Sequence, residues 1–272
     1  MYLKTHVAER FGRAADQYKC HSQVQDQAAE LLLQWLPHDL TKVPTLRCLD
    51  LGCGPGSQQG LLFEQLMWQE RRQQHLEYVG LDLSAAMVQA AQRNLAHLQV
   101  NGSVVQGDGE ALPLQRQSID LIYSNMAMQW FNRPDLALAE CARILTPSGY
   151  LLCSVVLPNS LAPLDQLLPN FVNPQRTFAD WQQLIADSPL QLLASEVRQV
   201  SGHFRDCKAL LKSISGVGAD AMPAHHDAAD DKKRLRLTKQ MWAQLNAGYE
   251  GYRTPKGLPL HYHIGFFLLR SQ

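Results

Sequence analysis

The chain has 272 residues, a length that open α/β sheets with insertions reach as one domain. Its 25 acidic and 25 basic residues cancel, so nothing in the overall charge requires a nucleic acid or an anionic membrane as partner. No apolar run is long enough to span a bilayer, and residues 1–10 carry charges where a secretory signal needs an apolar segment, so we expect a cytoplasmic protein.

An apolar stripe at helical spacing over 7–36 predicts a helix, and Pro37 and Pro44 bracket the linker that follows it. Strands and helices then alternate along the chain. We expect a strand ending at Leu51, a helix over 57–69, a strand over 77–81, a helix over 84–98, strands over 103–106 and 119–124, a helix over 134–145 and a strand over 150–156. Such alternation is typical of a parallel sheet with helices on both faces.

The rhythm changes after Leu157. The pattern predicts helices over 161–171 and 179–187, a strand over 190–200, helices over 206–215 and 230–246, and an edge or terminal strand over 262–269. No internal repeat or low-complexity tract occurs, so one domain with an insertion is the simplest organisation.

A glycine-rich turn follows the first predicted strand. The run reads Leu49-Asp50-Leu51-Gly52-Cys53-Gly54-Pro55-Gly56. Three glycines at alternate positions supply backbone angles and clearance that side chains would forbid, so the chain can approach a ligand closely. The G-x-G-x-x-G spacing of dinucleotide sites is missing, which disfavours an oxidoreductase, and Asp50 before the turn suits a cationic ligand better than a pyrophosphate.

Two further acids stand at the ends of predicted strands. Asp82 ends the second strand, where a carboxylate can accept hydrogen bonds from both ribose hydroxyls of a nucleoside. Asp108 follows the third strand, where it can accept a hydrogen bond from an adenine amino group. Each acid alone is equally well explained as a helix cap or a solvated strand end. The ordered set of three acids, together with the turn, favours a nucleoside site.

From Arg47 to Val156 these motifs resemble the class I S-adenosylmethionine-dependent methyltransferases. The resemblance implies a Rossmann-like α/β fold with a seven-stranded, mostly parallel sheet whose last strand is antiparallel. It implies S-adenosylmethionine as cofactor, with Asp50 and the glycine turn at its amino-acid end, Asp82 at its ribose and Asp108 at its adenine. The residues implied in cofactor binding are Asp50, Gly52, Cys53, Gly54, Gly56, Asp82, Leu83, Met87, Asp108, Gly109 and Asn125.

The same resemblance implies one methyltransferase domain over 1–272. A helical N-terminal segment over 1–44 forms a lid, and 45–157 form the cofactor-binding core, in which Leu83 and Met87 pack on the adenine ring. Residues 158–272 form the substrate half, with an inserted helical cap at about 202–256.

The segment after the fourth strand, Ser124 to Trp130, lacks the Asn/Asp-Pro-Pro-aromatic clamp usual in enzymes that methylate base or amide nitrogens. A nucleic-acid substrate is therefore disfavoured. Four segments resemble the malonyl-carrier-protein O-methyltransferases that begin biotin synthesis, so that the similarity covers nearly the whole chain. They are Phe11 to Tyr18, Ser124 to Trp130, Leu211-Lys212 with Gly216 to Ala219, and Pro259 to His263.

This second resemblance implies transfer of a methyl group to the free carboxylate of malonyl-acyl carrier protein. A carboxylate, with a pKa of about 4, is ionised at neutral pH and needs no general base, so positioning should dominate catalysis. The candidates for the acceptor pocket are Tyr18, Gln129, Trp130, Lys212 and His263. Core packing is the alternative for the two aromatic residues and His263, and surface solvation for Lys212.

A basic helix at 231–239 is a candidate for docking the acidic carrier protein. Its cations are Lys232, Lys233, Arg234, Arg236 and Lys239. A solvated helical face remains the alternative, because charge clusters on helices need no partner.

The cysteines and histidines indicate no metal site and no disulfide framework. The six cysteines form no C-x-x-C pair, and several stand in apolar strands, as reduced core thiols do. His225-His226 and His261-x-His263 lack a third ligand at a recognisable spacing.

Two alternatives to the malonyl reaction stay open. One is another small-molecule methyltransferase, acting on a quinone carbon or on a free carboxylic acid such as aconitate. The other is a non-catalytic module that binds S-adenosylmethionine and a partner through its cap.

Overall fold

The computed structural model of the chain describes residues 4–68, 75–98, 100–168, 172–219 and 238–272. They form the strands β1 (Thr45–Leu51), β2 (His75–Asp82), β3 (Gly102–Gln106), β4 (Ile119–Asn125), β5 (Leu145–Val156), β6 (Leu190–Phe204) and β7 (Leu258–Ser271). The sheet has the order β3-β2-β1-β4-β5-β7-β6. β1 to β5 run parallel, whereas β7 is antiparallel to both of its neighbours. This is the predicted Rossmann-like methyltransferase fold.

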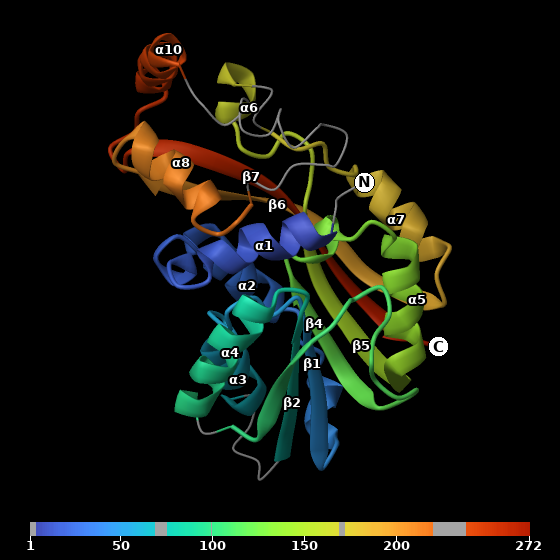
Figure 1. Cartoon of the computed structure of the whole chain (residues 1–272). Coiled ribbons are helices and arrows are strands. Elements are labelled where there is room, and N and C mark those ends of the chain that lie inside the picture. The colour runs from blue at the N-terminus through green and yellow to red at the C-terminus, as the bar shows by residue number, and fades with distance from the viewer. Residues whose placement is uncertain (1–3, 69–74, 99, 169–171, 220–237) are drawn as a thin grey trace.

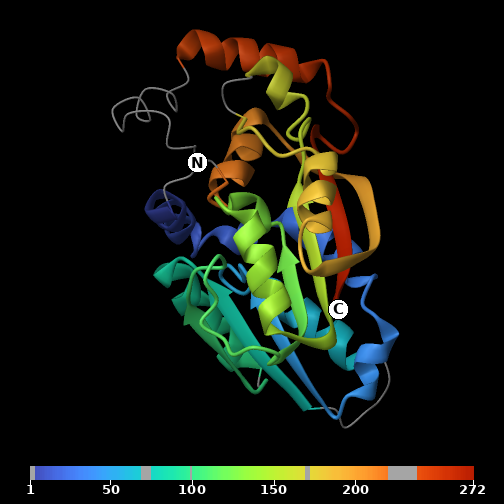
Figure 2. The same ribbon diagram turned by 90° about the vertical axis from the view of Figure 1, so that its right-hand side faces the viewer.

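Helices cover both faces of this sheet (Figure 1). On one side lie α2 (Gln23–Leu33), α3 (Gln59–Trp68) and α4 (Ala85–Leu98), and on the other lie α5 (Pro134–Ile144) and α7 (Phe178–Ala186). α1 (Lys4–Ala14) crosses in front of the sheet. The remaining helices are α6 (Leu164–Leu167), α8 (Cys207–Ser215) and α10 (Lys239–Glu250), which lie above α1 in Figure 1. Figure 2, turned by 90°, shows α10 at the same end of the molecule.

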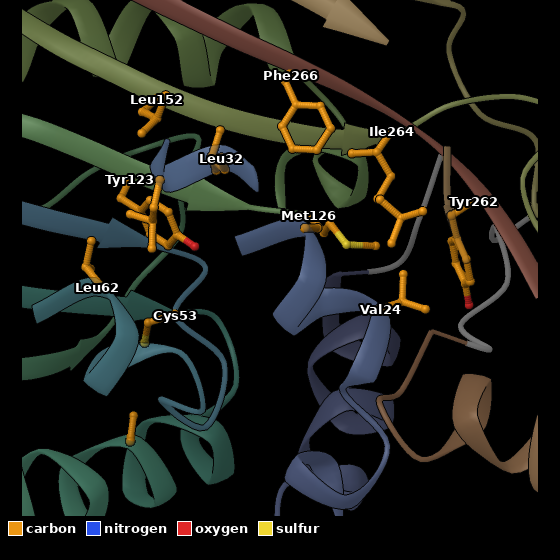
Figure 3. Close-up of a cluster of buried hydrophobic side chains, with 14 of the residues drawn as sticks. Val24, Leu32, Cys53, Leu62, Tyr123, Met126, Leu152, Tyr262, Ile264 and Phe266 are labelled. Carbon is orange, nitrogen blue, oxygen red and sulfur yellow. The ribbon is translucent and has the colours of Figure 1, made fainter. Parts of the chain in front are cut away.

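The alternation of side chains along each strand divides the core into two clusters. On β1, Cys48 belongs to the cluster under α2, α3 and α4, whereas Leu49 and Leu51 belong to the cluster under α5 and α7. Figure 3 shows the first cluster, in which Val24 and Leu32 of α2 lie close to side chains from β4, β5 and β7. Both faces of the central parallel strands β1 and β4 are therefore buried, as a parallel sheet requires.

The N-terminal segment is not the single helix that its apolar stripe predicts. α1 ends at Ala14, a 3-10 turn, η1 (Tyr18–Cys20), follows, and α2 begins at Gln23. α2 buries its apolar side chains against the sheet, whereas α1 packs on the start of α4. The stripe is shared by two helices with different packing partners, and its periodicity alone does not show the break.

Two other expectations need correction. The helix expected over 161–171 is only the single turn α6, which begins after Pro163. β6 extends to Phe204, past the expected strand end at residue 200. β7 is the expected terminal strand, and it lies between β5 and β6. α10 begins at Lys239, where Thr238 caps it, and residues 220–237 lie outside the described residues.

None of the described helices is both long enough and apolar enough to cross a bilayer.

Candidate functional site

The carboxyl ends of the parallel strands border one cavity, here called the strand-end cavity. Parallel strands direct their carboxyl ends to the same edge of the sheet, which is where ligands bind in open α/β folds. The predicted cofactor residues that line the cavity are Gly52 and Gly54 after β1, Asp82 and Leu83 at the end of β2, Asp108 and Gly109 after β3, and Asn125 at the end of β4. The structure therefore brings these seven predicted residues together around one cavity.

The glycine turn leaves room for a ligand at one position and for a neighbouring segment at another. Gly52 has φ +75°, and a Cβ there would lie 2.3 Å from Cβ of Ala127. Gly54 has φ +54°, and a Cβ there would meet nothing within 4 Å. Gly52 is thus needed for close packing against the segment after β4, whereas Gly54 faces open space.

Asp50 lies behind this turn and not on the cavity wall. It is 4% exposed, and Tyr78 Oη donates a 2.9 Å hydrogen bond to its Oδ2. The pKa of Asp50 is raised to about 7, chiefly by burial and also by the negative charge of Asp82, while the Tyr78 hydrogen bond opposes the shift. Among the described residues Asp50 has no cationic partner, so its negative charge favours a cation bound on the other side of the turn.

Asp82 holds the turn to β2 and also lines the strand-end cavity. Its Oδ2 accepts a 2.9 Å hydrogen bond from Gly54 N, and its Oδ1 accepts one of 2.8 Å from Ser84 N. Burial raises the pKa of Asp82 to about 6, although these backbone hydrogen bonds oppose the shift. The carboxylate retains lone pairs for hydroxyl donors on a ligand.

Asp108 is joined to α1. Lys4 Nζ lies 2.5 Å from Asp108 Oδ2 and 2.7 Å from Glu110 Oε2. Glu110 Oε1 in turn accepts a 2.7 Å hydrogen bond from Asn132 N. Both acids therefore fix the first turn of α1 over the adenine end of the predicted site.

The side chains of α1 form the roof of the strand-end cavity. Val7, Ala8 and Phe11 line it, and the cavity has a volume of only about 100 Å³. Ligand sites usually have roughly 300 to 1,000 Å³. The strand-end cavity is therefore smaller than a usual ligand site, because α1 lies over it.

A second and larger cavity, the cap cavity, adjoins the first. It has a volume of about 450 Å³ and is bordered by the segments after β4 and β5 and by the end of α8. Phe11, Tyr18, Met126 and Trp130 line both cavities and so form the wall between them. Phe11 and Trp130 meet edge to face, with ring centroids 5.2 Å apart. A group bound in one cavity therefore faces a group bound in the other across this wall.

Two polar side chains stand at or near this wall. Burial and the charges of Asp82, Asp26 and Asp50 raise the pKa of Tyr18, so its hydroxyl stays protonated and can donate. Gln129 lines the cap cavity, and its Nε2 donates a 2.7 Å hydrogen bond to the carbonyl oxygen of Met126. Its Oε1 is buried and has no partner among the described residues.

The other predicted residues line neither cavity. Cys53 and Gly56 belong to the turn but face inward, and Met87 of α4 is fully buried. Lys212 is exposed on α8. Burial lowers the pKa of the neighbouring His21, and the positive charge of Lys212 lowers it further. His263 Nδ1 lies 3.1 Å from the carbonyl oxygen of Asn159. Contacts of Lys212 and His263 with an acceptor stay predictions.

Of the basic helix, only Lys239 lies within the described residues, where it is exposed at the start of α10. The docking expectation for Lys232, Lys233, Arg234 and Arg236 falls outside them. The described residues contain no group of three or more His, Cys, Asp or Glu side chains placed to hold a metal ion.

Sequence reasoning missed Lys4 and Glu110, which fix α1 over the cavity, and assigned no role to Phe11. Lys4 and Asp108 are 104 positions apart, so no local pattern links them. Phe11 stands in a segment that carried the family resemblance, and this was the one available signal.

Comparison with known proteins agrees with this geometry. Residues 49–153 match the family model described as a methyltransferase domain. A malonyl-[acyl-carrier protein] O-methyltransferase from Alcanivorax borkumensis is 33% identical, over 97% of this chain and 85% of its own length. Another, from a Marinomonas species, is 30% identical over 97% of this chain and 92% of its own length. In fold, the chain resembles geranyl diphosphate C-methyltransferase from Streptomyces coelicolor, which was solved with S-adenosyl-L-homocysteine. The TM-score is 0.53 and the identity 12%, over 90% of this chain and 79% of that protein.

The fold, the strand-end acids and these matches define the chain as a class I S-adenosylmethionine-dependent methyltransferase. The residues present fit the cofactor, because a turn that leaves space at Gly54 and two carboxylates without cationic partners among the described residues suit a cationic nucleoside. Within that class the chain belongs to the sequence family of the malonyl-[acyl-carrier protein] O-methyltransferases.

We expect Asp50→Asn to stabilise the ligand-free chain at pH 8 and to weaken its binding of S-adenosylhomocysteine. The folded-state pKa of about 7 lies above the ordinary value of 3.8, so the folded chain keeps a proton that the unfolded chain releases. Stability therefore falls as the pH rises through that interval. Ionisation of the Asp50 carboxyl in the folded chain lowers the free energy of unfolding by on the order of 4 kcal/mol. The side-chain amide that replaces it in the variant is neutral at every pH, so the variant does not lose this free energy. Urea unfolding should give a larger gain at pH 8 than at pH 5, and an equal gain at both would contradict this assignment.

We expect Gly52→Ala and Gly54→Ala to separate packing from ligand approach. Both positions have positive φ, which opposes alanine by about 1–2 kcal/mol. Only at Gly52 does the new methyl group also overlap Ala127, so that variant should lose the greater free energy of unfolding. Gly54→Ala should keep most of its stability but lose affinity for S-adenosylhomocysteine in calorimetry. Unchanged affinity would show that the turn does not face the ligand.

Proposed function

We propose that this chain transfers a methyl group from S-adenosylmethionine to the free carboxylate of a malonyl group carried as a thioester on acyl carrier protein. The observation that carries the proposal is the similarity, over nearly the full length, to several malonyl-[acyl-carrier protein] O-methyltransferases. The adjoining cavities support it, because a two-substrate transfer needs donor and acceptor to meet at a shared wall.

The cofactor roles follow the strand ends. Gly52 and Gly54 hold the amino-acid end, with the charge of Asp50 behind them, and Asp82 receives the ribose hydroxyls. Asp108 and Gly109 border the adenine, beside Leu83. When bound, S-adenosylmethionine supplies a methyl group activated by a sulfonium cation.

The acceptor side needs positioning and not a base. The malonyl carboxylate is already ionised at neutral pH, so the chain has no proton to remove from it. Phe11, Tyr18, Met126 and Trp130 orient the acceptor toward the strand-end cavity and exclude water between the two. Such orientation of two reactants can supply on the order of 7 to 11 kcal/mol of the barrier.

α1 acts as a lid in this proposal. The strand-end cavity is too small for a nucleoside cofactor while Val7, Ala8 and Phe11 fill its roof, so α1 must move aside before binding. Lys4 ties its first turn to Asp108 and Glu110. A Cβ at Gly12 would lie only 2.9 Å from Oγ of Ser84, the residue before α4. The last turn of α1 therefore packs closely on the start of α4.

Incubation with methyl-labelled S-adenosylmethionine and a panel of acceptors tests the reaction. Malonyl-acyl carrier protein should gain one label in a base-labile ester. Acetyl-acyl carrier protein, which has no free carboxylate, should gain none, and a quinol precursor should stay unlabelled. Methylation of a free diacid or a quinol in preference to the malonyl thioester would overturn the substrate assignment, and cofactor binding without turnover on any acceptor would favour a non-catalytic module.

Replacing Lys4 tests the lid. We expect Lys4→Met to speed both association and dissociation of S-adenosylhomocysteine in stopped-flow fluorescence, because partly exposed ion pairs stabilise a closed form by up to about 1 kcal/mol, or roughly fivefold. Arg13→Met on the same helix is the matched control, since Arg13 pairs only with exposed Glu9 among the described residues. Equal rates in the two variants would contradict the lid.

A further inference from the structure

The solvent face of α8 carries unneutralised positive charge. Lys208 and Lys212 are both exposed and stand one helical turn apart, so their ammonium groups share one face. His21, after η1, lies against the end of this helix, since a Cβ built on Gly216 would be 2.2 Å from its Cδ2. Lys19, exposed on η1, adds a third cation on the segment that contacts α8.

These lysines differ from most other described cations of the chain. Lys4, Arg47, Arg133, Arg143 and Arg253 each form an ion pair with a described acid. No described acid pairs with Lys19, Lys208 or Lys212, and like charges one helical turn apart are mildly unfavourable. In a chain of net charge zero this face is a local positive excess that an anionic partner would neutralise.

The inner side of the same helix borders the cap cavity. Ile214, near the end of α8, lines that cavity, and so do Val217 and Ala219 in the segment that follows. A helix with its side chains is only about 10–12 Å across, which is less than the length of an extended phosphopantetheine arm. An arm anchored on the outer side of α8 is therefore long enough to extend past the helix to this cavity.

We infer that the face formed by Lys19, Lys208 and Lys212, the α8 face, docks the acidic surface of a carrier domain whose phosphopantetheine arm delivers the malonyl thioester to the cap cavity. This rests on the proposed function, and it assigns the docking to described residues outside the basic helix at 231–239. Exposed charge pairs of this kind chiefly speed association and weaken with salt. The α8 face thus recognises the carrier, whereas the wall between the cavities recognises the acyl group.

Charge reversal on α8 tests the docking surface. We expect Lys208→Glu to lower kcat/KM for malonyl-acyl carrier protein by about fivefold or more, and Lys208→Glu with Lys19→Glu to lower it further. Neither should change kcat/KM for malonyl-N-acetylcysteamine, which has the thioester but no carrier and no phosphate. Arg116→Glu is the matched control, because it makes the same charge change at an exposed position before β4 that lines neither cavity.

The outcomes separate this inference from the proposed function. Methylation of malonyl-acyl carrier protein by the unaltered chain, with equal losses in Lys208→Glu and Arg116→Glu, would overturn the α8 face and leave the proposed function standing. Equal losses on the carrier substrate and on malonyl-N-acetylcysteamine would also overturn it, because the lysine would then act on turnover and not on docking. No methylation of either substrate by the unaltered chain would remove both. Urea unfolding midpoints within error of the unaltered chain exclude misfolding as the cause.

Discussion

The site depends on the burial of two carboxylates, Asp50 and Asp82. The parallel sheet brings both to one edge, where the negative charge of Asp82 raises the energy of ionised Asp50. Neither has a cationic partner among the described residues, so the ligand-free chain bears the unfavourable energy of charge in a region of low dielectric. A sulfonium and an ammonium on one nucleoside would relieve it. The two buried carboxylates thus destabilise the ligand-free site. A cationic cofactor lowers their energy, whereas the negative charges of a dinucleotide would raise it.

The rest of the molecule is arranged around that edge. α1 closes it from above, and the segment after β4, where Met126 has φ +52°, forms part of the wall to the cap cavity. Because Phe11 of α1 lines both cavities, a movement of α1 would change the walls of both cavities together. Binding of the cofactor under α1 would therefore complete the acceptor pocket, a coupling that needs no base and no metal ion.

The sheet and its strand-end residues could be predicted from the sequence because each signal is local. Gly52, Gly54, Asp82 and Asp108 follow apolar strands, and parallel pairing is enough to bring them to one edge. The break between α1 and α2 could not be predicted, since one apolar stripe serves two packing surfaces. The contact of Lys4 with Asp108 has no local pattern, and the inward position of Met87 depends on how α4 turns toward the sheet. Lys212 and His263 stand in segments that carry family resemblance, yet line neither cavity.

The most direct test of the account is a crystal structure of the chain with S-adenosylhomocysteine and a stable malonyl thioester analogue. The account predicts ribose hydroxyls within hydrogen-bond distance of Asp82, the ammonium group over the glycine turn in front of Asp50, and the sulfur facing the analogue's carboxylate across Tyr18 and Trp130. A nucleoside bound elsewhere, or a sulfur turned away from the cap cavity, would contradict it.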